Sequence, residues 1–89
     1  MLWQNYPNPF NPATTIKYSI PAAGEVKLTI FDITGREVAL AVNETKQAGE
    51  YTHSFDGYSL SSGVYFYRLD VNTSAGVNFS RTKKMVLIK

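Results

Sequence analysis

Apolar and polar side chains alternate along most of this chain with the period of a β-strand. Between residues 14 and 20, Ile16, Tyr18 and Ile20 alternate with polar residues, which predicts a strand with one buried face. Segments 25–31, 36–42, 50–56 and 64–71 repeat the pattern, and from residue 77 the apolar side chains stand mostly at odd positions. The side chains expected to face the core in these later segments are Val26, Leu28, Ile30, Val38, Leu40, Val42, Tyr51, His53, Phe55, Tyr65, Tyr67, Leu69, Val71, Met85 and Leu87.

Turn residues separate these segments, and no segment has the period of a helix. Gly24 and Gly35 follow the first two apolar runs, and we expect each to adopt a positive φ. A chain of 89 residues builds one small core. The sequence therefore predicts an all-β fold, an immunoglobulin-like antiparallel β-sandwich of about seven strands. It would occupy residues 13–89 and follow an extended proline-rich strap at residues 1–12.

Two aromatic residues in the strap predict how it packs. The segment "NYPNPFNP" contains three prolines, which exclude a helix and favour polyproline II geometry with three residues per turn. Tyr6 and Phe10 then lie on apolar edges, and Asn5, Asn8 and Asn11 share a polar edge. We expect Tyr6 and Phe10 to be buried structural anchors, and the asparagines to meet polar partners or water.

A third structural anchor is expected in "LSSGVY", where a tyrosine begins a late strand. In immunoglobulin-like sandwiches such a tyrosine fixes a corner by bonding to nearby backbone. Tyr65 should therefore bury its ring and bond to backbone near Leu60 or Ser61.

Composition excludes several kinds of chemistry. The chain has no cysteine, and His53 has no second histidine with which to share a metal ion. Asp32, Asp56 and Asp70 lie near expected turns, where bonding to backbone amides is their ordinary role. The net charge of +2 is too small and too scattered for nucleic-acid binding, and no apolar run could span a membrane. We expect no catalytic residue, metal site, cofactor or enzymatic activity.

One alternative for the aromatic residues remains open. Trp3, Tyr6, Phe10, Tyr58 and Phe66 could form a platform on which sugar rings stack. The chain would then be a structural or carbohydrate-binding module of an extracellular enzyme.

Five sequence blocks together closely resemble the C-terminal sorting domains of the bacterial type IX secretion system. They are "QNYPNPFNPATTIKYSIP", "KLTIFDITGREV", "AGEYTHSFDG", "LSSGVYFYRL" and "KKMVLIK", and they cover nearly the whole chain in the family's order. These domains are immunoglobulin-like sandwiches, also similar to a domain of flagellar hook-capping proteins. The departure here is Ser61, where a proline is common.

The resemblance implies a sorting signal that guides a passenger protein, attached on the N-terminal side, through the outer-membrane translocon. It also implies passage through the periplasm to the cell surface or the extracellular space, with a sortase as a further partner. Lys89 would be the natural C-terminus, and we expect the domain to be a monomer. The candidate recognition residues are Gly35, Arg36, Gly63, Tyr65, Lys83, Lys84 and Lys89.

The final strand should pair with the segment 64–71 and leave its other side as a sheet edge. Lysines protect such an edge against indiscriminate pairing. A translocon partner could still read the edge by adding a strand to it.

Overall fold

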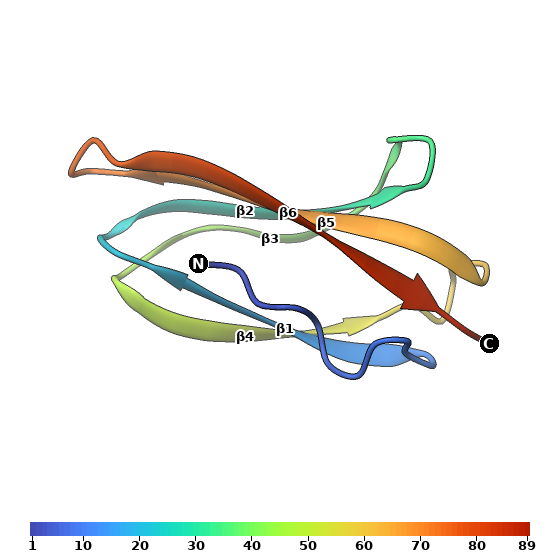
Figure 1. Ribbon diagram of the computed structural model, residues 1–89. Coiled ribbons are helices and arrows are strands. Elements are labelled where there is room, and N and C mark those ends of the chain that lie inside the picture. The colour runs from blue at the N-terminus through green and yellow to red at the C-terminus, as the bar shows by residue number, and fades with distance from the viewer.

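A computed structural model describes residues 1–89 and contains six β-strands and no helix. The strands are β1 (Ala13–Ile20), β2 (Gly24–Asp32), β3 (Glu37–Lys46), β4 (Gly49–Asp56), β5 (Gly63–Thr73) and β6 (Asn78–Leu87). All strand pairs are antiparallel, in a two-stranded sheet β1-β4 and a four-stranded sheet β3-β2-β5-β6. Figure 1 shows these as two layers, with the N-terminal strap running between them on the near side. The predicted β-sandwich is confirmed.

The core lies between the two sheets, where the alternating apolar positions meet. The predicted inward residues of β1, β2 and β5 are all buried, and so are Met85 and Leu87 of β6. Within the two-stranded sheet, Tyr51 of β4 stacks on Tyr18 of β1, with ring centroids 5.6 Å apart. On these strands the period of two therefore predicted the buried face correctly.

Strand β3 departs from the predicted alternation because its pairing with β2 is irregular. Leu28 lies opposite Val42, but the next residue of β2, Thr29, lies opposite Leu40, so Ala41 has no counterpart. This β-bulge reverses the direction in which the side chains point. Leu40 consequently turns away from the core and is 44% exposed, and the prediction that it faces inward is wrong.

The two glycines that end the first runs have different reasons to be glycine. Gly35 has a φ of 87° in the turn between β2 and β3, as predicted. Gly24 does not have a positive φ, and that prediction is wrong. A Cβ atom at Gly24 would instead lie 2.3 Å from the carbonyl oxygen of Asn72, so only glycine permits the close approach of β2 and β5.

The strap joins the edges of both sheets. Its first half pairs with β1, through bonds from the Trp3 amide to the Lys17 carbonyl and between Tyr6 and Thr15 in both directions. Its second half pairs with the end of β6, where the Phe10 amide donates to the Val86 carbonyl. These bridges take the place of a seventh strand.

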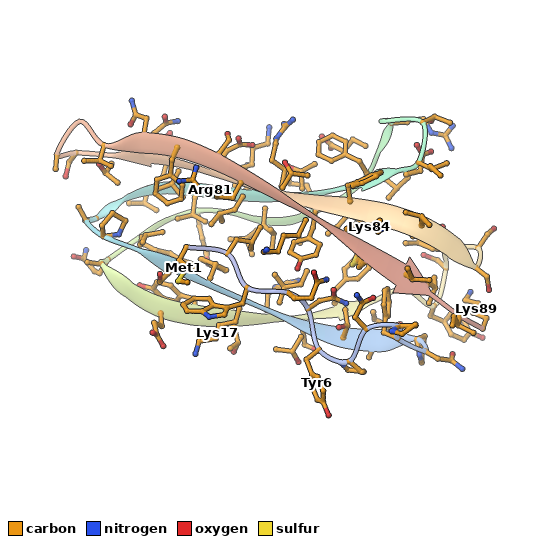
Figure 2. All side chains as sticks on the ribbon, viewed as in Figure 1. Met1, Tyr6, Lys17, Arg81, Lys84 and Lys89 are labelled. Atoms are coloured by element: carbon orange, nitrogen blue, oxygen red, sulfur yellow. The ribbon has the colours of Figure 1, made fainter.

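Burial along the strap does not follow a period of three. Phe10 is 1% exposed and packs edge-on against Phe55, with ring centroids 6.3 Å apart. Tyr6 is 80% exposed and points away from the sandwich in Figure 2. The prediction that Tyr6 is a buried anchor is therefore wrong, because the strap holds this residue by its backbone.

Asn5 holds the strap from within the sandwich. Its side chain is buried and donates to the hydroxyl of Thr14 and to the carbonyl of Pro7. Asn8, by contrast, is exposed and accepts a bond from the Val86 amide. Both asparagines meet the polar partners that the sequence predicted.

Candidate recognition surface

The corner at the start of β5 is formed by Tyr65. Its hydroxyl donates to the carbonyl of Ser61 over 2.6 Å, and its ring is buried. Gly63, two residues earlier, lies opposite Leu87 of β6. The corner predicted from "LSSGVY" is thus present, and it joins the β4–β5 loop to the last strand.

The C-terminal residue lies against the same loop. The Lys89 amide donates to the hydroxyl of Ser62 over 3.0 Å, and its ammonium group donates to the carbonyl of Tyr58. That ammonium group also lies 5.5 Å from the centroid of the Tyr58 ring. Lys89 is therefore held in place at the surface by three contacts with residues 58–62.

The β2–β3 hairpin is organised by Asp32. Its carboxylate accepts bonds from the backbone amides of Thr34 and Arg36, 2.9 and 3.0 Å away, and from the Thr34 hydroxyl. The Thr34 hydroxyl bond, with the two amides and the Arg36 charge, lowers the pKa of this carboxyl. The turn fixes Gly35, and the Arg36 side chain is 80% exposed while its guanidinium group lies 3.3 Å from the Asp32 carboxylate.

Hairpin and corner lie at the same end of the sandwich, because Asp32 is directly opposite Tyr65 in the sheet. Figure 1 shows the β2–β3 turn, the start of β5 and the C-terminus at this end. We call residues 33–36, 57–63 and 88–89 the corner end. Five of the seven candidate recognition residues therefore lie at this end of the sandwich: Gly35, Arg36, Gly63 and Lys89 within these ranges, and the buried Tyr65 directly beside them.

The other two candidates lie further back on β6 and do not form one patch. Lys84 is opposite Phe66 and Lys83 is opposite Tyr67, so their side chains leave the sheet on opposite faces. Figure 2 shows Arg81, Lys84 and Lys89 spaced along the last strand. Basic side chains are therefore spaced along β6 as far as the corner end, on both faces of the sheet, and we call them the basic row.

The expected free edge of β6 is only partly free. The strap engages the Lys84 carbonyl through the Gln4 side chain, and the Val86 amide through the side chain of Asn8. The Phe10 backbone bonds the Val86 carbonyl and the Ile88 amide. Sequence reasoning missed this closure, and no local pattern signals it, because the partners are nearly eighty residues apart.

Two other sequence interpretations need correction. Phe10 is buried, so the five aromatic residues cannot form one exposed platform for sugars. Asp32 and Asp56 do bond to backbone amides near turns. Asp70 instead lies within β5 and binds the side chains of Arg68 and Ser80.

The structure contains no group of three or more His, Cys, Asp or Glu side chains that could hold a metal ion. It also contains no helix with the length and apolar character needed to cross a bilayer.

Comparisons with known proteins identify the family from one match and the fold from another. The family model of the secretion system C-terminal sorting domain matches residues 4–88. A comparison with curated proteins finds no match. Among solved structures, the crystal structure of CopC from Methylosinus trichosporium OB3b is similar, with a TM-score of 0.57 and 18% identity, over 97% of this chain and 90% of that one. At that identity the likeness concerns the fold alone.

Proposed function

Because this chain belongs to the family of type IX secretion system C-terminal sorting domains, we propose that it carries a covalently attached passenger through the outer-membrane translocon to the cell surface. The family match over residues 4–88 is the observation that carries this proposal. The passenger precedes the strap, and the translocon and a sortase are the partners. The domain acts by being recognised and has no catalytic role.

We place recognition at the corner end and along the basic row of β6. Arg36 and Lys89 are exposed cations on backbone that hydrogen bonds hold in one conformation. A surface held in this way loses little conformational entropy when a partner binds. Its positive charges favour a partner surface that is acidic.

A fusion experiment tests the function itself. The domain is attached to the C-terminus of a neutral passenger and expressed in a host with a working type IX system and in the same host without its translocon. We expect the passenger on the surface of the first host only. Equal surface levels in the two hosts would overturn the proposal.

A charge variant tests the recognition surface. The chain has six lysines, so replacing Lys83, Lys84 and Lys89 with glutamine has a matched control in Lys17, Lys27 and Lys46. We expect both variants to fold, and only the first to lose export. Normal export of a folded first variant would show that these lysines are not read by the translocon.

A further inference from the structure

The first part of β6, residues 78–83, keeps an open edge, because no residue of the strap bonds to its backbone. The strap bonds to the backbone groups of Lys84, Val86 and Ile88 that face away from β5. Because alternate residues of a strand turn their backbone groups to the same side, those of Ser80 and Thr82 also face away from β5. The Arg81 side chain donates to the Ser80 carbonyl. The amides of Ser80 and Thr82 and the carbonyl of Thr82 remain open to another chain.

Charge along this open edge has one sign. Arg81 and Lys83 lie on it, Lys84 follows directly, and β6 has no acidic residue. None of the four ion pairs in the structure involves β6. The cations of the open edge therefore form no ion pair within the domain, and the nearby Asp70 carboxylate is bonded to Arg68 and Ser80.

An apolar groove of about 450 Å³ borders the same edge. Ile20 and Pro21 line it at the end of β1, Val77 and Phe79 line it around the start of β6, and Met1 of the strap lines its remaining side. Arg81 stands at the groove and also over the ring of Phe79, 5.4 Å from its centroid. An apolar side chain of a bound peptide would fit here beside a cation.

We propose that the open edge binds an extended acidic segment of a partner protein as an added strand. Backbone bonds to Ser80 and Thr82 hold the segment, its carboxylates meet Arg81 and Lys83, and an apolar residue enters the groove. The strap already bonds to the other half of this edge through one backbone bridge, between Phe10 and Leu87, so an added strand would continue an existing contact. The inference rests on the proposed function only in naming the export machinery as the source of the segment.

Binding is tested on the purified domain, without any export step. The probe is an end-blocked peptide in which one valine and two glutamates occupy alternate positions with threonine between them, so that all three side chains share the face of Phe79, Arg81 and Lys83. Binding is followed by amide NMR shifts. We expect saturable shifts at Ser80, Thr82 and Lys84, weakened by salt, and none with the same peptide carrying lysine in place of both glutamates. Shifts confined to other strands, or equal binding of both peptides, would overturn the proposal.

Two variants separate the backbone and charge contributions. Thr82→Pro removes an amide that faces away from β5, which an edge strand tolerates, and should abolish the saturable shifts in a folded domain. Replacing Arg81 and Lys83 with glutamine should weaken binding roughly three- to tenfold, as expected for two exposed ion pairs. The matched control replaces Lys17 and Lys27 and should leave binding unchanged.

Two outcomes would assign the edge differently. Self-association of the Arg81 and Lys83 variant with unchanged peptide affinity would mean that these cations only block edge pairing. Loss of peptide binding when a passenger precedes Met1 would assign the groove to the chain's own preceding residues. Either result overturns the inference, whereas the surface level of the passenger decides the proposed function separately.

Discussion

The hydroxyl oxygen of Tyr67 lies 2.8 Å from the backbone nitrogen of Asn5 and accepts its hydrogen bond. The same hydroxyl donates to the carbonyl of Trp3 over 2.8 Å. Tyr67 belongs to β5 and is fully buried, and Asn5 is 2% exposed. A central strand thus holds the strap by two adjacent backbone groups, which makes the strap part of the folded core.

Replacing Tyr67 with phenylalanine should weaken this attachment. The change keeps the ring but leaves a buried amide and a carbonyl without partners, at a cost of about 1–3 kcal/mol in the free energy of unfolding. Urea unfolding measures the loss in the free energy of unfolding, and hydrogen exchange at the Asn5 amide measures how far the strap has loosened. Tyr6→Phe is the control, since the side chain of Tyr6 is exposed. Equal stability of Tyr67→Phe and Tyr6→Phe would show that the Tyr67 hydroxyl does not hold the strap.

Stability should also depend on alkaline pH through Tyr67. Burial raises the pKa of its hydroxyl from 10.0 to about 12, against the opposing effect of the Asn5 amide bond. A group whose pKa is higher in the folded state stabilises the protein fully below its unfolded pKa, and that contribution is lost as pH rises toward the folded pKa. The stability difference between wild type and Tyr67→Phe should therefore narrow between about pH 10 and 12. A constant difference across this range, measured by urea unfolding, would refute the role of Tyr67.

The sequence predicted the strands wherever the ladder is regular. Ile16, Leu28 and Leu69 are buried as their alternation requires. The prediction failed at Leu40, because the β-bulge at Ala41 arises from pairing with β2 and leaves no mark in the local pattern.

Only the part of the recognition surface that depends on a local motif was predictable from the sequence. The corner of Tyr65 joins residues only four apart, so a local motif could reveal it. Covering of the β6 edge by the strap depends on bonds between Asn8 and Val86 and between Gln4 and Lys84. Such contacts form only when both sheets are already in place, and the three-residue period of the strap could not predict them.

The two aromatic residues of the strap should respond differently to truncation. Phe10 is 1% exposed, so Phe10→Ala should cost about 3–5 kcal/mol. Tyr6→Ala should change stability by no more than about 0.5 kcal/mol, as is usual for surface positions. Thermal unfolding of the two variants compares them directly. A larger loss for Tyr6→Ala than for Phe10→Ala would contradict the packing of the strap.

Tyr65 should contribute through its ring more than through its hydroxyl. Truncation to alanine removes a buried aromatic ring, at about 3–5 kcal/mol, which is a large part of the total stability of a small domain. Tyr65→Phe loses only the bond to Ser61 and should cost about 1–2 kcal/mol. Melting temperatures of the two variants check this order, and a wild-type melting temperature for Tyr65→Ala would show that the corner does not stabilise the fold.

Thr29 offers the opposite case, a buried polar group whose removal should help. It is fully buried in β2, and its hydroxyl oxygen has no hydrogen-bond partner. Burying an unpaired hydroxyl costs about 1–3 kcal/mol, and valine keeps the branched shape that a strand favours. Thr29→Val should therefore be neutral or raise the free energy of unfolding by about 1 kcal/mol. Thr14→Val is the matched control, because the Thr14 hydroxyl donates to Pro7 and accepts from Asn5, so its loss should destabilise. If urea unfolding shows equal losses for both variants, the Thr29 hydroxyl has a partner in solution.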